Sequence, residues 1–391
     1  MSIPQIEIQV IAIIVAVACA IPGAFLVLRR MAMISDAISH AILPGIVIGF
    51  FITRDVSSPF LVLMAAATGV LTVVLVELIN RTRLVKEDAA IGLVFPALFS
   101  IGVILITRFA GDVHIDTHAV LVGELAFAPF NQLIINGEAM GPKSMWVMGG
   151  ILVLSIVLLG VFYKELKIST FDPQLAASLG FTPVVIHYGL MTMTSITAVG
   201  AFDAVGAILV VALMIVPPAA AYLMTQALNR MLILSSAIGI LAAIAGYWTA
   251  HFLNVSIGGS MATILGFIFL LIYFFAPKRG VISVLMRRNQ QKLEFSMLTF
   301  LLHLRNHSIE TGNPEERKVS HLTGHFQWTP KRAKEVLEFA ENNNMIRITD
   351  GMVELTDKGY SFTDEAMQYI LTDKKNELES MKGRFLLFRA E

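Results

Sequence analysis

Apolar residues between positions 8 and 276 form blocks long enough to cross a bilayer, which takes about 20 helical residues. Short polar segments separate the blocks. This alternation predicts nine membrane-spanning helices, near residues 8–28, 32–52, 58–80, 89–107, 145–163, 184–202, 204–224, 232–252 and 258–276. Asp203 alone separates 184–202 from 204–224, so a single span there would reduce the count to eight. The pattern therefore predicts an all-α polytopic membrane protein.

The pattern changes near residue 280. From Gln290 to the end, 102 residues contain 14 Lys and Arg, 16 Asp and Glu, and no apolar run long enough to span. A segment of about 100 residues is a common domain size. We predict two domains, a membrane domain over 1–280 and a small α+β domain over 290–391.

Cations are unevenly distributed among the connections between spans. One alternate set of connections holds ten of them: Arg29, Arg30, Arg81, Arg83, Lys86, Lys164, Lys167, Arg230, Lys278 and Arg279. The other set holds Arg54, Arg108 and Lys143. The positive-inside rule assigns the ten-cation set to the cytoplasm. With nine spans, the N-terminus is then outside and the second domain is cytoplasmic.

Composition excludes several functional classes. The chain is 56% hydrophobic and only 15% charged, well below the charged fraction of an ordinary soluble domain. Its 29 Lys and Arg equal its 29 Asp and Glu, which argues against nucleic-acid binding by bulk charge. A single cysteine, Cys19, excludes a disulfide framework and a multi-thiolate metal site. The chain also lacks the G-x-x-x-x-G-K-[ST] phosphate loop, so it does not bind ATP by that route.

The second predicted span carries two ionisable residues, which are rare within a bilayer. Asp36 and His40 are four residues apart and so lie on one helix face. A carboxylate and an imidazole at this spacing can supply two ligands to a divalent first-row metal. The alternatives are an Asp–His contact that ties two helices together, or a proton relay. Pro44 and Gly45 follow directly and predict an interrupted helix, as transport sites often have.

A second polar cluster follows the fourth span. Its possible metal ligands are His114, Asp116, His118 and, further on, Glu124, all of them oxygen or nitrogen donors. The alternative is a solvated loop in which His and Asp are concentrated by chance. For His187 and His251, which stand singly in or near spans, we expect packed or hydrogen-bonded helix positions.

The connection between the fifth and sixth spans predicts a short helix of about two turns. Asp172 suits the N-cap, Pro173 the first helical position and Gly180 the C-terminal cap, because these residue types favour those positions. Phe171 and Leu175 are four apart, a spacing that would place them on one helix face. A docking helix for a partner protein explains such a segment better than a bare loop does.

Two consecutive prolines, Pro217 and Pro218, fall inside the seventh predicted span. Each removes a helical hydrogen bond. A bilayer tolerates this only where protein or water satisfies the carbonyl that is freed. We therefore expect protein or water to satisfy the carbonyls that these prolines free.

Three separate motifs together resemble one family. They are Ser35–Gly45, the segment around Phe171–Pro173, and Val205–Pro217, and the resemblance covers residues 8–277. The family is the membrane permease of bacterial ABC importers for manganese, zinc and iron. The resemblance implies that Asp36 and His40 line the transport route as metal ligands. It also implies that the short helix docks into an ATPase subunit through the positions Phe171, Asp172, Pro173, Leu175 and Gly180.

The same resemblance implies the working context of the chain. Residues 112–130 are similar to permeases that serve manganese or iron, so Mn²⁺ is favoured as cargo, with Zn²⁺ or Fe²⁺ as alternatives. An extracytoplasmic binding protein would deliver the metal, and a separate subunit would hydrolyse ATP. We expect this chain to be no enzyme, to hold no permanent cofactor, and to pair with a second copy or a similar permease in the bacterial cell membrane.

The second domain resembles the winged helix of iron- and manganese-dependent repressors. Helices are predicted at 295–304, 317–326 and from Thr329 onward, and strands at 345–349 and 352–356 flank the turn residues Asp350 and Gly351. The excess of acidic over basic residues argues against DNA binding, despite the basic stretch Lys331, Arg332 and Lys334. We expect a regulatory or assembly role. The candidate sensor ligands are His303, His307, His321 and His325, and the more common alternative is that they are scattered surface histidines.

Two other functions remain as alternatives. One is a membrane-tethered, metal-responsive regulator whose winged helix binds operator DNA. Metal-dependent DNA binding by residues 290–391 would favour it. The other is a proton- or sodium-coupled carrier, which loss of uptake on removal of an ATPase partner would exclude.

Overall fold

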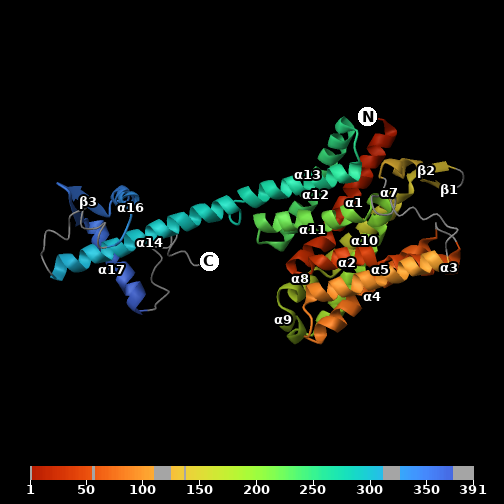
Figure 1. Ribbon diagram of the computed structural model, residues 1–391, viewed down its shortest axis with the longest axis horizontal. Coiled ribbons are helices and arrows are strands. Elements are labelled where there is room, and N and C mark those ends of the chain that lie inside the picture. Colours follow the sequence, from red (N-terminus) through yellow and green to blue (C-terminus); the bar gives the residue numbers. More distant parts are fainter. Residues whose placement is uncertain (1, 55–57, 110–124, 136–137, 311–325, 373–391) are drawn as a thin grey trace. The chain divides into compact units, whose positions relative to one another are not determined.

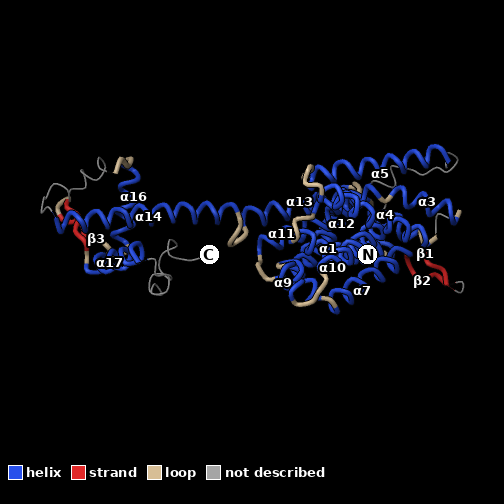
Figure 2. The backbone as a smooth tube through the Cα atoms, turned by 90° about the horizontal axis from the view of Figure 1, so that it is seen from below, coloured by secondary structure: helices blue, strands red, loops and turns tan. Residues whose placement is uncertain are grey.

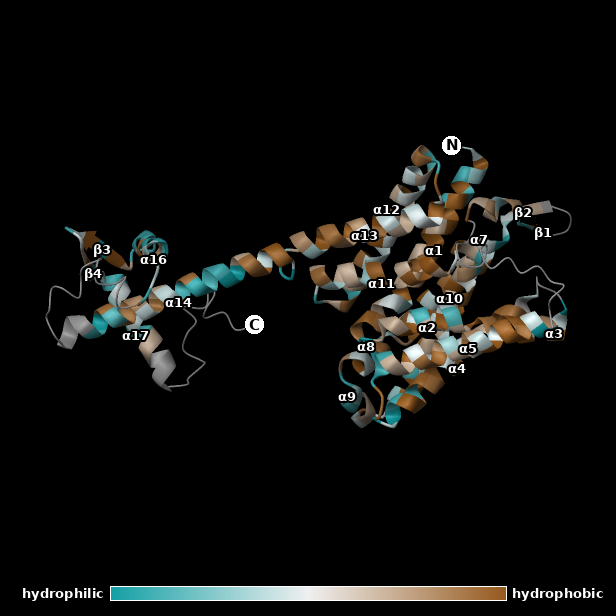
Figure 3. Ribbon diagram, in the orientation of Figure 1, coloured by the Kyte–Doolittle hydropathy of each residue, from teal (hydrophilic) through white to brown (hydrophobic). Residues whose placement is uncertain are grey.

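The computed structural model describes residues 2–54, 58–109, 125–135, 138–310 and 326–372. Two compact units make up the chain, Met1–Gly280 and Val281–Glu391. Figure 3 shows that apolar residues dominate the helices of the first unit, whereas polar residues are frequent in the second. Each unit has its own buried core.

The first unit is a helical bundle with one small hairpin (Figures 1 and 2). Its longer helices are α1 (Ile3–Leu28), α4 (Pro59–Arg81), α5 (Glu87–Phe109), α7 (Lys143–Val161), α10 (Pro183–Val205), α11 (Ala207–Met224), α12 (Leu228–Leu253) and α13 (Ile257–Phe275). The shorter elements are α2 (Ala32–Ala41), α3 (Leu43–Thr53), η1 (Leu125–Phe130), β1 (Gln132–Ile135), β2 (Glu138–Pro142), α8 (Tyr163–Phe171) and α9 (Pro173–Ser178).

Nine segments in the described part of the chain are long and apolar enough to cross a membrane. They are the eight longer helices and the combined α2–α3 segment, Ala32–Thr53. This confirms the predicted polytopic all-α membrane fold. It also settles the region 184–224, where α10 and α11 are separate helices.

The break between α10 and α11 differs from the predicted one. Asp203 lies inside α10, and the chain turns at Gly206, which has φ 81° and ψ 163°. Residues with a side chain rarely adopt this conformation, whereas glycine does so at little cost. The separator is therefore Gly206, and the prediction that Asp203 divides the two spans is wrong.

Helix α1 lies at the centre of the first unit and packs against α7, α10, α11 and α12. Pro218 in α11 has no N–H to donate to the carbonyl of Met214, four residues earlier. Gly23 of α1 covers this carbonyl so closely that a Cβ on Gly23 would lie 2.0 Å from Met214 O. The backbone of α1 therefore lies directly against the carbonyl that Pro218 frees.

The second unit contains α14 (Val281–Glu310), α16 (Pro330–Asn342), the antiparallel pair β3 (Ile346–Thr349) and β4 (Met352–Leu355), and α17 (Asp357–Thr372). Asp350 and Gly351, with φ of 51° and 76°, form the turn between the strands. The Thr329 hydroxyl accepts a hydrogen bond from Arg332 N and caps α16. The predicted hairpin and this helix start are confirmed.

Two details of the second unit bear on its predicted winged-helix arrangement. The predicted helix 295–304 is the middle of the much longer α14. The predicted helix 317–326 lies almost wholly outside the described residues, so the winged-helix arrangement stays a prediction.

Candidate functional site

The candidate metal ligands Asp36 and His40 lie on α2, which packs against α4, α5, α10 and α11. His40 Nε2 is 3.5 Å from Asp36 Oδ1. The His40 and Asp36 side chains are 34% and 38% exposed, respectively. The predicted pairing of a carboxylate and an imidazole on one helix face is therefore present in the structure. Both side chains remain partly open to a further group.

The span that carries this pair is interrupted directly after it. Helix α2 ends at Ala41 and α3 begins at Leu43, with Ile42 between them. Pro44 has no N–H, so the helical bond to the His40 carbonyl is not made. Gly45 allows α4 to approach closely, because a Cβ there would lie 2.3 Å from Thr68 Oγ1. The Pro–Gly pair thus produces both the predicted interruption and the tight α3–α4 contact.

The described neighbours of the pair on α2 and α5 are two serines and an aromatic ring. Ser35 and Ser39 on α2 are buried, and the Ser39 hydroxyl donates to the Ser35 carbonyl at 2.9 Å. The Phe95 ring of α5 lies 5.8 Å from the His40 ring, measured between centroids. Within the described residues, no group of three or more His, Cys, Asp and Glu could hold a metal ion. Asp36 and His40 are therefore the two candidate ligands that the described part of the chain brings together here.

The predicted short helix exists as α9, and its caps are those expected. Asp172 Oδ1 accepts a hydrogen bond from Leu175 N at 2.9 Å, and Pro173 is the first helical residue. Gly180 has φ 86°, and Phe181 N donates to Ala176 O at 3.0 Å. This is the bond pattern of a Schellman C-cap. Both ends of α9 are fixed by its own sequence.

One expectation about this segment is wrong. Phe171 is the last residue of α8, and Asp172, with φ −146° and ψ 89°, interrupts the helix before α9 begins. Phe171 and Leu175 therefore do not share a helix face. They are nevertheless exposed together with Leu179, at 56%, 48% and 57%. The α8–α9 corner therefore carries three exposed apolar side chains, which we call the exposed patch.

Arg29, directly after α1, ties this corner to the bundle. Its Nε donates to Thr170 Oγ1 at 3.1 Å and its Nη2 to Ser169 Oγ at 3.4 Å, both on α8. Its Nη1 lies 3.4 Å from His187 Nδ1 on α10. Burial lowers the pKa of the Arg29 guanidinium. We call Arg29, Ser169, Thr170 and His187 the arginine junction; it confirms the expectation of a hydrogen-bonded His187.

A second polar contact lies beside the arginine junction. The Tyr188 hydroxyl of α10 donates a hydrogen bond to the carboxylate of Glu77 on α4. Glu77 also forms an ion pair with Arg81 at 2.8 Å. The start of α10 is thus held to α1 and α8 through His187 and to α4 through Tyr188. From the sequence, His187 was expected to be packed or hydrogen-bonded, and Arg29 and Arg81 were noted only as cations of the cytoplasmic connections.

The remaining candidate ligands are distributed as follows. His251 on α12 is exposed and stacks with Tyr247, with ring centroids 6.3 Å apart. His303 is half-buried on α14, with its ring 5.0 Å from that of Phe326. His307 also belongs to α14. The other candidates lie outside the described residues: His114, Asp116, His118, Glu124, His321 and His325.

Comparison with known proteins gives a consistent result. The model of the ABC 3 transport family matches residues 6–276. The chain is 46% identical over 355 residues to the zinc transport system membrane protein TroD of Treponema pallidum (strain Nichols). This alignment covers 91% of this chain and 96% of TroD. It is 49% identical over 281 residues to the manganese transport system membrane protein MntD of Bacillus subtilis (strain 168). This second alignment covers 72% of this chain and 95% of MntD.

Among solved structures, the chain is similar to PsaBC from Streptococcus pneumoniae, described in complex with Fab. The TM-score is 0.61 at 29% identity, over 73% of this chain and 96% of that chain. The 355 residues aligned with TroD exceed the matched family region, so that likeness extends into the second unit. The match to MntD uses 281 residues and nearly the whole of MntD. Relatives thus occur with and without a counterpart of the second unit.

Proposed function

Because the chain belongs to the ABC 3 transport family, we propose that it is the permease subunit of an ATP-driven importer for a divalent transition metal. Mn²⁺ is the favoured cargo, and Zn²⁺ or Fe²⁺ are the alternatives. The relatives named above, which carry manganese or zinc in their names, support this cargo class. ATP hydrolysis belongs to a separate subunit.

The observation that carries the proposal is the Asp36–His40 pair on an interrupted span. The two groups present one oxygen and one nitrogen ligand, a combination that suits Mn²⁺, Fe²⁺ and Zn²⁺. The Asp36 charge offsets part of the charge of a dication. Conduction requires a site strong enough to admit the ion and weak enough to release it. Two protein ligands, with the rest supplied by water or further groups, meet that requirement better than a closed cage.

We place the ATPase contact at the α8–α9 corner. Exposed Phe171, Leu175 and Leu179 can fill an apolar pocket on a partner, while the Asp172 and Gly180 caps keep α9 rigid. Lys164 and Lys167 precede this corner and assign it to the cytoplasmic side under the positive-inside rule. Movement of the ATPase would then displace α8 and α9, together with the residues that are hydrogen-bonded to them.

The arginine junction supplies the link from this contact to Asp36 and His40, which we call the metal pair because they are the two candidate metal ligands. Arg29 binds Thr170 and Ser169 on α8, and only Arg30 and Met31 separate it from the start of α2. The turn is tight: Met31 N donates to Leu26 O at 2.9 Å, and Arg30 has φ 62°. A non-glycine residue in this region stores strain and fixes the turn. Movement of α8 therefore passes to α2 through a short, stiff connection.

Two further partners complete the proposal. An extracytoplasmic binding protein delivers the metal to the face opposite the α8–α9 corner. A second permease, either another copy or a similar chain, pairs with this one. The matched PsaBC chain, of which 96% is covered, was likewise solved as part of a multi-chain complex.

Uptake of radioactive manganese by cells tests the proposal. We expect uptake to require this chain and the ATPase subunit, and to be reduced by excess unlabelled Mn²⁺. The same competition with unlabelled Zn²⁺ or Fe²⁺ ranks these two ions as alternative cargoes, since the better cargo reduces manganese uptake further. Uptake that persists without the ATPase but collapses with the proton or sodium gradient would replace the proposal with a coupled carrier.

A further inference from the structure

Helix α14 of the second unit carries a face that mixes apolar and cationic side chains. Leu285, Arg288, Lys292 and Phe295 follow one another at spacings of three, four and three, so they share that face. All four are exposed, Leu285 at 58% and Phe295 at 60%. In Figure 3, polar (teal) and apolar (brown) stretches follow one another along α14. Lys and Arg beside large apolar side chains suit a membrane surface, because their charged heads can reach the phosphate layer while the apolar side chains enter the acyl boundary.

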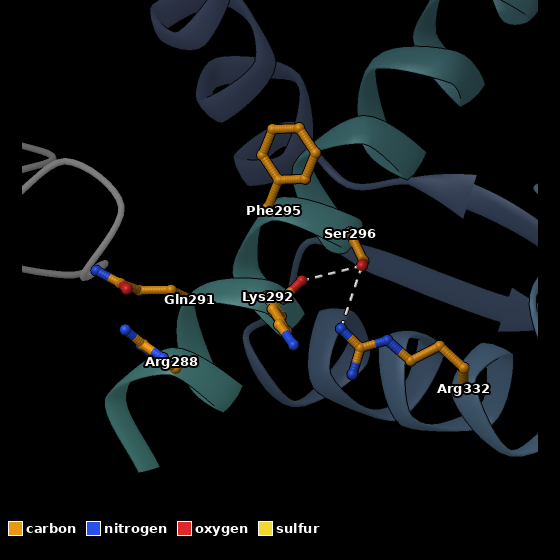
Figure 4. Close-up of a pocket in the computed structure, with 6 residues that line it drawn as sticks. All are labelled: Arg288, Gln291, Lys292, Phe295, Ser296 and Arg332. Atoms are coloured by element: carbon orange, nitrogen blue, oxygen red, sulfur yellow. Dashed lines mark hydrogen bonds between the residues drawn. The ribbon is translucent and has the colours of Figure 1, made fainter. Parts of the chain in front are cut away.

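A cavity of about 490 Å³ opens on this face. Its lining comprises three cationic side chains, two uncharged polar ones and one aromatic ring, and no carboxylate: Arg288, Gln291, Lys292, Phe295, Ser296 and Arg332 (Figure 4). Arg332 comes from α16 and donates through Nη2 to the Ser296 hydroxyl at 3.2 Å. Its Nη1 lies 3.3 Å from Glu335 Oε2, outside the lining. The guanidinium is therefore held in place at the wall of the cavity.

Among the residues that the structure describes, the other two cations, Arg288 and Lys292, have no such partner. Within the described residues, Arg288 and Lys292 form no ion pair, although they stand four apart on the same helix face. Like charges at this spacing repel each other and destabilise a helix. An anion bound between them and Arg332 would relieve that repulsion. Because Arg and Lys both bind phosphate oxygens well, a phosphate group is the anion that fits this lining.

We propose that this cavity binds the phosphate of an anionic phospholipid headgroup and attaches the second unit to the membrane surface. Two observations favour lipid over a soluble phosphate compound. Exposed Leu285 and Phe295 flank the cations and can enter the acyl boundary. Arg288 comes soon after the end of α13 in the sequence, and Lys278 and Arg287 add to the charge of the same stretch. Basic clusters directly after a membrane helix on its cytoplasmic side bind anionic lipids.

A fluorescent label in the cavity tests this in the full chain. The native Cys19 is buried, so Gln291→Cys introduces a single accessible thiol for an environment-sensitive dye. The labelled protein is placed in nanodiscs of phosphatidylcholine, with or without phosphatidylglycerol. We expect a blue shift that grows with the phosphatidylglycerol fraction. Arg288→Gln and Lys292→Gln should each raise the midpoint of this titration about fivefold, the effect of one Lys or Arg near an anionic surface.

Lys331→Gln is the matched control, since Lys331 is exposed on α16 but does not line the cavity. It removes the same charge from the second unit and should leave the midpoint unchanged. An equal effect of all three substitutions would show that general charge attraction acts without a site, which overturns the proposal. A blue shift in pure phosphatidylcholine discs on addition of inorganic phosphate or ATP would assign the cavity to a soluble anion and overturn the lipid assignment.

Discussion

The metal pair and the arginine junction are both polar groups of the first unit, but they differ in how fully their atoms are used. Asp36 and His40 share one contact of 3.5 Å, and each side chain remains about one-third exposed. Arg29 reaches three partners on two other helices with all three of its guanidinium nitrogens. The pair is therefore available to a ligand, whereas the junction is committed to holding helices together.

This difference separates two roles that look alike in the sequence, where both appear as isolated polar residues near apolar spans. A polar group with unused bonding capacity inside an apolar bundle is costly unless cargo uses it. A saturated group stabilises one arrangement of helices and transmits their movement. Substitutions should accordingly abolish metal passage in the pair without unfolding the protein, and weaken coupling in the junction.

The largest effect is expected at the metal pair. Asp36→Ala or His40→Ala removes a ligand and should reduce metal uptake by about 100-fold or more, since loss of even an outer-shell partner costs ~10–100-fold. Because Asp36 and His40 are about one-third exposed and form their polar contact with each other, the amount of folded, membrane-inserted protein should not change. Uptake of labelled manganese and size-exclusion profiles measure the two quantities.

Asp36→Asn sharpens this test. The amide keeps the size of the carboxylate but loses the charge that offsets the dication, so uptake should fall nearly as far as in Asp36→Ala. Ser39→Ala is the control, since it removes only a hydroxyl that is bonded to its own helix. Wild-type uptake in either alanine variant of the pair would disprove the ligand assignment.

Features of the site that depend on residues close together in the sequence could be predicted, whereas those that depend on distant residues could not. The Asp36–His40 pair, the Asp172 cap and the Gly180 turn all depend on residues close by in the chain, and each was predicted. The partners of Arg29 lie 140, 141 and 158 residues away along the chain, and nothing local marks them. The helix break at Gly206 was misplaced because the charged Asp203 was a more conspicuous signal than a backbone dihedral angle.

The next effect concerns the exposed patch at the α8–α9 corner. Phe171→Asp or Leu175→Asp places a charge where a partner pocket is apolar, and should reduce the stimulation of ATPase activity by the loaded binding protein about tenfold or more, at roughly 1.5–3 kcal/mol per lost apolar side chain. Gln174→Asp, on an exposed position of α9 outside this patch, is the control. Unchanged stimulation in both patch variants would move the docking site elsewhere.

A smaller effect is expected at the arginine junction. Arg29→Lys keeps the charge but cannot reach Thr170, Ser169 and His187 together, because an ammonium is a point charge without the planar fork of guanidinium. Bonds to a charged donor contribute about 1.5–3 kcal/mol. We therefore expect several-fold less metal transported per ATP hydrolysed, with the ATPase rate and metal affinity close to wild type.

Arg30→Lys provides the matched control, because it makes the same substitution one residue away, at an exposed position. A structural role alone would lower the melting temperature and leave the transport-to-hydrolysis ratio of the folded protein intact. That outcome in Arg29→Lys would reduce the junction to a stabilising contact and remove it from the coupling route.

The smallest effect is expected when the second unit is removed altogether. A cut after Gln290 would divide α14, so the chain is better ended at Gly280, where the first unit closes. The exit of α13 is fixed within that unit, since Arg279 lies 4.5 Å above the Tyr222 ring and donates to the Tyr222 carbonyl. The shortened chain should insert and transport at a measurable rate. If the second unit senses metal, uptake by the full chain should fall as internal manganese rises, whereas uptake by the shortened chain should not. Identical uptake curves for the two chains would exclude a sensor. Assembly or membrane attachment would then be the role of the second unit.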